Sequence, residues 1–174
     1  MELREIPKFI VDKGVEKGAT DVAAAVVNCE SRMIRFSNSK VSISKSYSKA
    51  YVSIYLMMKN RRAAISISDL NEKSLIEAVE RAIKTAKITP PADVYAPLPS
   101  GPFRYDETLL APSSVSLDPS LLTGYVDEAI DGALEQGVKK VAGSLTATNA
   151  EFFLATSSNV SASQTSSALE VSVR

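Results

Sequence analysis

The sequence contains no histidine, and this absence removes several classes of chemistry at once. A Ser-His-Asp triad, a Cys-His dyad, a histidine general base and a histidine-bearing zinc site are all excluded within its 174 residues. There is no tryptophan, and the single cysteine cannot form an internal disulfide, which is typical of a reducing, cytosolic setting. The commonest catalytic arrangements are therefore not available within these residues.

The sequence also lacks an excess of charge of one sign and a long apolar run. The 20 Lys and Arg residues balance 20 Asp and Glu residues, so no overall field attracts nucleic acid or a membrane. The longest apolar run, residues 22–27, is far shorter than the roughly 20 residues that cross a bilayer. The amino terminus has mixed charges and lacks the apolar segment of a signal peptide. We expect a cytoplasmic protein without a membrane partner.

The distribution of proline predicts how the chain is organised. Seven of the 8 prolines fall between Pro90 and Pro119, where fixed backbone angles and missing donors exclude a regular helix or a central strand. We therefore predict a first helix–sheet–helix unit over 1–89, an extended connector over 90–117 and a second helix–sheet unit over 118–174. Aromatic and leucine side chains would anchor the connector: Tyr95, Leu98, Phe103, Tyr105, Leu109 and Leu110.

Hydrophobic periodicity predicts the elements of the first unit. A helix over 3–17 ends at Gly18, and a second helix begins with Asp69 as its N-cap and ends at Thr89. Between them lie five strand-like runs, 21–29, 32–38, 40–47, 49–58 and 63–68. The residues expected to be buried are Leu3, Ile6, Phe9, Ile10 and Val15 in the first helix, and Leu75, Ala78, Val79, Ala82, Ile83 and Ala86 in the second.

The second half of the chain repeats the first with a constant offset of 119 residues. Asp118 and Pro119 begin a helix that Gly137 ends, and strand-like runs follow to Arg174. Its expected apolar stripe is Leu122, Tyr125, Val126, Ala129, Ile130, Ala133 and Leu134. The predicted fold class is therefore α+β, a helix plus a mostly antiparallel multi-stranded sheet, occurring twice as a pseudo-repeat. The second copy stops before a counterpart of residues 63–89, so we expect the amino-terminal domain of a longer protein.

The clearest charged segment is residues 31–62, with eight basic side chains and no acidic one. Such a sheet face could contact nucleic acid or an acidic peptide, although lysines that protect edge strands and keep the surface solvated give the same pattern. Lys45, Lys49, Arg61 and Arg62 are the candidate contacts for a peptide or an anion. No residue is assigned a catalytic or metal-binding role, because neither an activated nucleophile nor a carboxylate cluster is visible.

Several segments together resemble the TldD/PmbA family, also called the modulators of DNA gyrase. The resemblance covers most of residues 1–100 and continues more loosely to 174. It is carried by the segments Gly18–Asp21, Arg35–Val41, Ala63–Leu70, Glu77–Lys87, Thr89–Asp93 and Leu98–Pro99. The junction at 68–70 and the 89–93 spacing are more similar to the PmbA type than to the TldD type.

The resemblance implies a two-domain subunit whose α+β amino-terminal domain precedes a larger β-rich domain. In the family, TldD-type subunits carry a His-Glu-x-x-x-His motif for a zinc-type metal and pair with PmbA-type subunits in a peptidase that acts on unfolded peptides. No position of that motif exists in this chain. The implied function is therefore a non-catalytic domain of such a peptidase, with a TldD/PmbA-type partner subunit and an unfolded peptide as substrate. The alternative is a small nucleic-acid-binding or gyrase-regulating module that uses the basic 31–62 face.

Overall fold

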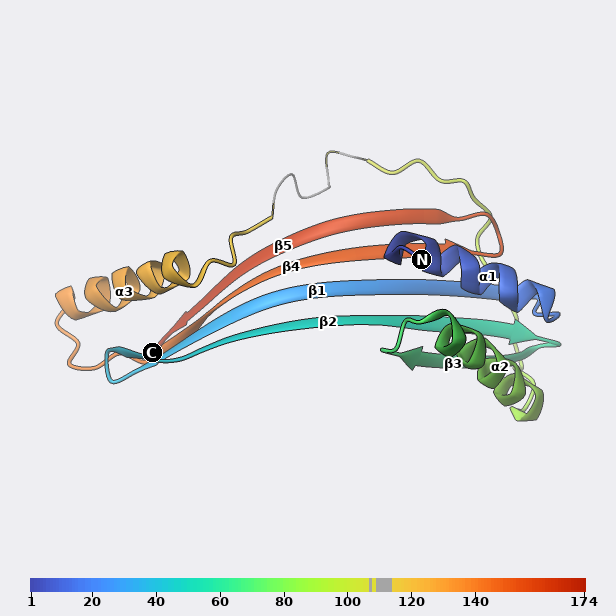
Figure 1. The fold of residues 1–174 in the computed structure, drawn as a ribbon, viewed down its shortest axis with the longest axis horizontal. Helices are drawn as coiled ribbons and strands as arrows, with labels where there is room; N and C mark the ends of the chain where they lie inside the picture. The colour runs from blue at the N-terminus through green and yellow to red at the C-terminus, as the bar shows by residue number, and fades with distance from the viewer. Residues whose placement is uncertain (107, 109–113) are drawn as a thin grey trace. The chain divides into compact units, whose positions relative to one another are not determined.

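The computed structural model describes residues 1–106, 108 and 114–174, which form helices on a five-stranded sheet (Figure 1). The helices are a short 3-10 turn at Leu3–Glu5, α1 at Ile6–Glu16, α2 at Glu72–Ile88 and α3 at Pro119–Glu135. The strands are β1 at Asp21–Ser37, β2 at Lys40–Met58, β3 at Arg61–Ile67, β4 at Gly143–Thr156 and β5 at Ser161–Val173. They are ordered β3-β2-β1-β4-β5 in the antiparallel sheet. The predicted α+β class is confirmed.

Two of the strands are longer than the sequence indicates. The runs predicted at 21–29 and 32–38 form one 17-residue strand, and those at 40–47 and 49–58 form one 19-residue strand. The predicted break around Ser31 is wrong because this side chain is satisfied inside the sheet, where its Oγ lies 2.9 Å from Thr148 Oγ1 on β4. A polar side chain does not interrupt the backbone ladder once it finds a partner.

Two-residue turns connect the first three strands. Asn38 and Ser39 join β1 to β2 with φ angles of 51° and 58°, and Lys59 and Asn60 join β2 to β3 with 47° and 61°. Positive φ at both central positions matches the twist of the flanking strands. The second turn is shorter than the sequence indicates, because Arg61 already pairs with Met58.

The described residues form two compact units, and the long strands contribute to both. The first contains residues 1–28, 49–108 and 151–164, and the second contains 29–48, 109–150 and 165–174. The units therefore do not follow the order of the sequence. The division at 89/90 and 117/118 stays a prediction.

The core of the first unit lies between the sheet and the helices α1 and α2. All six positions predicted for the α2 stripe are buried, together with Val52, Ile54 and Leu56 of β2. The N-cap of α2 differs from the prediction: Asn71 Oδ1 accepts from the backbone N–H of Ser74 at 2.8 Å, and Asp69 supports Asn71 from outside the helix. In α1, Ile6 and Ile10 are buried as predicted, but Val15 is 47% exposed.

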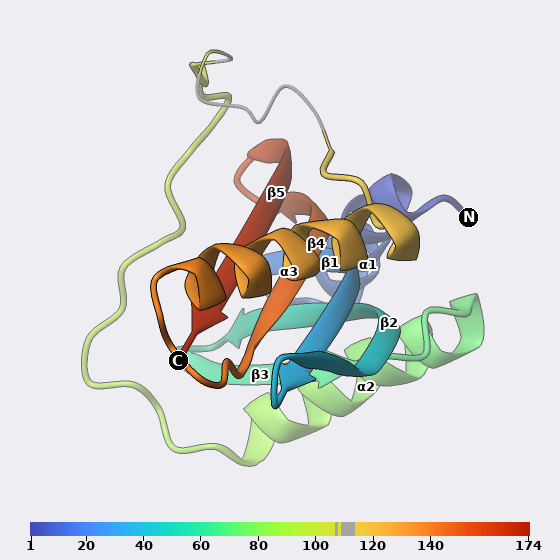
Figure 2. The same cartoon turned by 90° about the vertical axis from the view of Figure 1, so that its left-hand side faces the viewer.

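The core of the second unit lies under α3, which crosses β1 and β4 (Figure 2). Asp118 caps this helix as predicted, accepting from the backbone N–H of Leu121 at 2.8 Å. Leu122, Val126 and Ile130 are buried, but the prediction is wrong for Tyr125 and Leu134, which are exposed. In the described part of this unit a single helix covers the sheet, whereas α1 and α2 both cover it in the first unit. Only the centre of the apolar stripe of α3 therefore packs against the strands.

Residues 90–106 of the connector are extended and attached to the first unit, whereas Val115 exchanges hydrogen bonds with Asn149 in the second unit. The backbone N–H of Ala92 donates to Asn60, Tyr95 donates to Asp21 Oδ2 at 2.7 Å, and the backbone N–H of Gly101 donates to Ser158. Tyr95, Phe103 and Tyr105 are all exposed, but the hydroxyl of Tyr95 still contacts Asp21 on β1. Leu98 is half-buried, and the last two predicted anchors, at 109 and 110, lie outside the described residues.

Candidate functional site

β5 is the last strand on one side of the described sheet, so its outer edge has no neighbouring strand there. Ala142 and Arg174 exchange two backbone hydrogen bonds, and at the other end of the hairpin Thr156 donates to Val160. Both contacts give the same antiparallel register, so the even-numbered residues of β5 bond to β4. The odd-numbered residues therefore direct their N–H and C=O groups away from β4, toward the edge.

The two edge strands of the sheet are protected very differently. β3 is short and carries Arg61 and Arg62. β5 has 13 residues, no lysine or proline, and Glu170 as its one charged side chain. Natural edge strands are usually blunted by charge, proline or shortness, because an unpaired edge recruits other strands. The composition of β5 instead leaves its edge available to an additional strand.

A groove runs between α1 and the start of β5 in the first unit. Its main part has a volume of about 610 Å³, with Val11 and Val15 on the helix side and Ala155 and Ser161 on the sheet side. A neighbouring hollow of about 370 Å³ shares Ala155 and Ser161 and extends to Ser163. The exposed Val15, which the sequence places in the core, is thus part of the groove wall.

The charges along the groove compensate one another. Lys8 Nζ lies 2.9 Å from Asp12 Oδ2, and Lys13 Nζ lies 2.8 Å from Glu16 Oε2. The Lys13 ammonium holds the pKa of the Glu16 carboxyl below its ordinary value. The groove therefore offers main-chain donors and acceptors, small polar side chains and apolar contacts, without a field of either sign.

The four candidate contact residues are not gathered into one cluster. Lys45 belongs to the second unit, and Lys49, Arg61 and Arg62 belong to the first. Within β2, Lys49 is nine positions from Met58, the partner of Arg61, which corresponds to about 30 Å along a strand. The ammonium of Lys49 lies 4.9 Å from the ring centroid of Tyr51.

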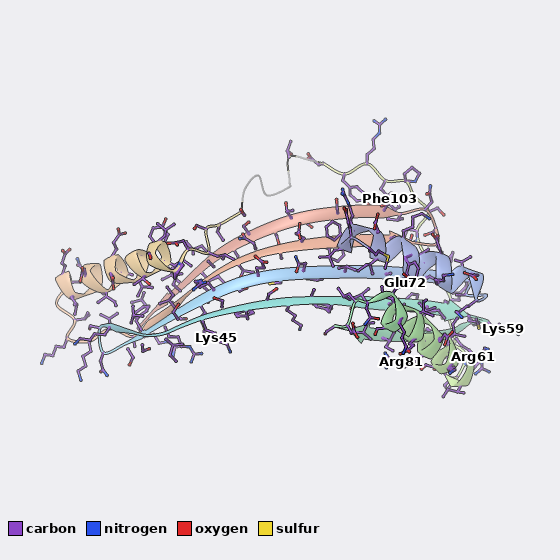
Figure 3. All side chains as sticks on the ribbon, viewed as in Figure 1. Lys45, Lys59, Arg61, Glu72, Arg81 and Phe103 are labelled. Atoms are coloured by element: carbon purple, nitrogen blue, oxygen red, sulfur yellow. The ribbon has the colours of Figure 1, made fainter. Side chains whose placement is uncertain are left out.

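The two arginines have different surroundings. Arg61 Nη1 donates to the carbonyl of Thr89 at the end of α2, and Figure 3 shows Arg61 beside that end of the helix. Its guanidinium is thus already engaged in holding a helix terminus. Arg62 pairs with Met57 in the register and is exposed. Three of the four candidates, Lys45, Lys49 and Arg62, are exposed.

The described residues do not fit a zinc-type site. No three His, Cys, Asp or Glu side chains lie together in 1–106, 108 and 114–174, and the whole sequence lacks histidine. Within the same residues, no helix has the length and apolar character to cross a bilayer.

Comparison with known proteins connects this helix–sheet arrangement to one family. Residues 22–86, from β1 to near the end of α2, match the family model described as PmbA/TldA metallopeptidase domain 1. No curated protein sequence matches the chain significantly.

Solved structures share the fold over nearly the whole chain. TldE from Thermococcus kodakarensis is 21% identical with a TM-score of 0.81, and the match covers 97% of this chain and 39% of that one. A protein of Thermotoga maritima, described as a candidate modulator of a DNA gyrase, is 12% identical with a TM-score of 0.79 and coverages of 98% and 39%. A similarly described protein of Bacteroides thetaiotaomicron is 14% identical with a TM-score of 0.70 and coverages of 97% and 40%.

The chain therefore shares its fold with part of each of these longer proteins and spans about two fifths of their length. Residues 22–86 thus match the first domain of the PmbA/TldD family, and the solved structures share the fold of the chain. The family resemblance stated from the sequence is confirmed.

Proposed function

We propose that this chain is the non-catalytic amino-terminal domain of a PmbA/TldD-type peptidase and that it guides an extended, unfolded peptide toward a metal centre elsewhere in the assembly. The observation that carries the proposal is the open edge of β5, bordered by the groove along α1. A peptide strand that pairs with this edge gains main-chain hydrogen bonds, which do not depend on its side chains. Such binding suits substrates that share an unfolded backbone and little else.

The hydrolytic step belongs outside these residues in this proposal. The family description names a metallopeptidase, but the described part of the chain holds no metal-ligand cluster. The metal would be of zinc type and would be held by a TldD-type partner subunit, with this chain contributing to a PmbA-type subunit of a cytoplasmic dimer. The similarity to a protein named TldE supports the existence of such a partner.

The binding test uses two substitutions at one outward-facing position. Ser163→Pro removes the edge N–H donor while leaving the even-numbered bonds to β4, and Ser163→Ala removes only the hydroxyl. We expect Ser163→Pro to weaken the binding of an unfolded peptide about tenfold. This is the effect of losing about one hydrogen bond between uncharged main-chain groups, together with the disturbed pairing of the residues beside it. Ser163→Ala should bind as the parent does.

Circular dichroism and thermal unfolding show whether Ser163→Pro retains the fold. A folded Ser163→Pro variant that binds peptide as tightly as the parent chain would contradict strand addition at β5. Equal weakening by Ser163→Ala would instead assign the contact to the hydroxyl.

The basic residues of 31–62 support a narrower proposal, a preference for acidic peptide segments. It applies to the exposed cations Lys45, Lys49 and Arg62, whereas Arg61 also serves α2. Charge reversal at the three exposed positions should reduce binding of an Asp- and Glu-containing peptide more than binding of a neutral one, as measured by fluorescence anisotropy. Equal affinities for both peptides, unchanged by the reversals, would exclude this preference.

A further inference from the structure

The first serines of β5 point to the helix-covered face of the sheet. Counting from the Thr156–Val160 pair places Ser161 opposite Ala155 and Ser163 opposite Phe153. Ala155 and Phe153 belong to the core of the first unit, which α1 covers. Because directly opposite residues of an antiparallel pair point to the same face, both serines lie on the side of α1 (Figure 1).

A peptide strand added to the β5 edge would follow the same geometry. Its residues opposite Ser161 and Ser163 would be two positions apart, with both side chains on the face of α1 and the side chain between them on the other face. Directly opposite Cβ atoms lie about 4.5–5.5 Å apart. A long peptide side chain could therefore extend past a serine toward the helix.

Two hollows lie where these peptide side chains would point. The hollow of about 610 Å³ borders Ser161, and the one of about 370 Å³ borders both Ser161 and Ser163. All the residues that line them belong to the first unit. Each hollow has room for a side chain of the size of leucine.

The walls of the hollows favour an uncharged, apolar side chain. Val15 is 47% exposed there, so a leucine that packs against it removes apolar surface from water on both sides of the contact. The charged side chains of the walls all have partners: Arg4 with Glu2, Lys8 with Asp12, and Glu16 with Lys13. A charged peptide side chain would therefore meet no unpaired charge of the opposite sign in these walls.

We infer that the groove selects, among unfolded peptides, segments with apolar side chains at every second position, two of which enter the hollows opposite Ser161 and Ser163. This inference rests on the proposed strand addition and names the class of segment that the addition favours. Alternating apolar residues are typical of a half-buried strand, which a folded protein conceals and an unfolded one exposes. The groove thus adds a preference for unfolded proteins to main-chain pairing, which by itself accepts any extended backbone.

Three ten-residue peptides in a background of serine, glycine and glutamine test the spacing. The first carries two leucines separated by one residue, the second has the same composition with the leucines separated by two residues, and the third has no leucine. We expect the first to bind the chain about tenfold more tightly than the second and about a hundredfold more tightly than the third, as measured by fluorescence anisotropy. The reason is that half-burying one leucine side chain contributes about a factor of ten, and only the first peptide can place both on one face.

The outcomes separate this inference from the proposed function. Equal binding of all three peptides, weakened by Ser163→Pro, would overturn the preference and leave strand addition intact. Equal binding of the first two, both tighter than the third, would also overturn the inference, because the apolar contact would not follow the register of a strand. If no peptide binds, the proposed function fails and the inference fails with it.

A matched pair of variants locates the preference in the groove. Val15→Ser removes apolar surface from the groove wall, and Val138→Ser does the same at an equally exposed valine, 47%, in the second unit. We expect Val15→Ser to weaken binding of the first peptide about threefold and to leave the leucine-free peptide unchanged. Val138→Ser should change neither affinity. Equal effects of the two variants on the first peptide, or an equal loss for both peptides in Val15→Ser, would contradict the inference.

Discussion

At the scale of single residues, two helical glycines with different surroundings make a matched test of packing. A Cβ added at Gly14 of α1 would lie 2.7 Å from Val22 Cγ2, whereas one added at Gly124 of α3 would meet nothing within 4 Å. Val22 is fully buried and stiff at χ1, so it cannot move away cheaply. Gly14→Ala should therefore destabilise the chain by about 1–3 kcal/mol.

The control for Gly14→Ala is the same substitution in open space. Gly124→Ala should stabilise the chain by about 0.5–1 kcal/mol, because alanine loses less backbone entropy in a helix. Urea unfolding measures both. Stabilisation by Gly14→Ala would show that α1 does not pack against β1 as closely as described.

The cap of α2 predicts an acid-sensitive contribution to stability. Ser74 Oγ donates to the Asp69 carboxylate at 2.8 Å, and the backbone N–H of Asn71 donates to it at 3.2 Å. These hydrogen bonds, that of Ser74 first, hold the pKa of Asp69 below its ordinary value. Because the folded pKa is the lower one, this stability is present above the ordinary carboxyl pKa and is lost as pH falls through the folded pKa.

Urea unfolding over a series of acidic pH values tests the cap. Asp69→Asn should lower the free energy of unfolding near neutral pH and reduce its dependence on acid. Asn71→Ala should cost about 1 kcal/mol at neutral pH and retain the acid dependence that Asp69 contributes. An unchanged pH profile in Asp69→Asn would contradict the described role of this carboxylate.

At the scale of elements, the contact between the connector and the sheet should lose its stabilising effect as pH rises, whereas the cap of α2 loses its effect as pH falls. The hydrogen bond from Tyr95 to Asp21 raises the pKa of the tyrosine hydroxyl. Its stabilising effect is therefore complete below the ordinary tyrosine pKa and is lost as pH rises through the folded value. Tyr95→Phe should lower stability at neutral pH and speed proteolysis within 90–106, and the difference from the parent should shrink in alkali.

Limited proteolysis at several pH values checks the connector prediction, with Tyr105→Phe as the control because Tyr105 is 54% exposed. Cleavage rates that are equal in Tyr95→Phe and the parent at neutral pH would show that Tyr95 does not fasten this segment.

Helices and strands with strong hydrophobic periodicity could be predicted from the sequence. The neighbouring elements against which they pack could not. All six buried positions of α2 follow from three- and four-residue spacing, because the sheet covers the full width of that stripe. Val15 and Tyr125 were misplaced because apolar character cannot show which side of a helix has a neighbour. The merged strands show the same limit, since the partner that satisfies Ser31 is more than a hundred residues away in the sequence.

The candidate site was less accessible to sequence reasoning than the fold. The serines of β5 were correctly predicted to lie on a strand, but an edge is a property of strand order, and β3-β2-β1-β4-β5 could not be read from the pattern. The lack of lysine and proline in 161–173 was the one available signal. The family resemblance indicates the class of function, whereas the strand order of the structure identifies the outer edge of β5 as the candidate site.

At the scale of the whole molecule, charge distribution predicts weak binding to DNA. The chain has no net charge, and its candidate cations are divided between two units. Binding to duplex DNA should be weak and should be abolished near physiological salt, as measured by fluorescence anisotropy. Tight binding with a steep salt dependence that charge reversal at Lys45, Lys49 and Arg62 removes would favour the nucleic-acid-binding alternative.

The most direct test of the central claim is a map of photo-crosslinks from an unfolded peptide that carries a photoreactive group, read by mass spectrometry. The account predicts crosslinks concentrated at residues 161–165 of β5 and on the groove side of α1, and their loss in Ser163→Pro but not in Ser163→Ala. An absence of crosslinks at every strand edge, with peptide bound, would contradict it.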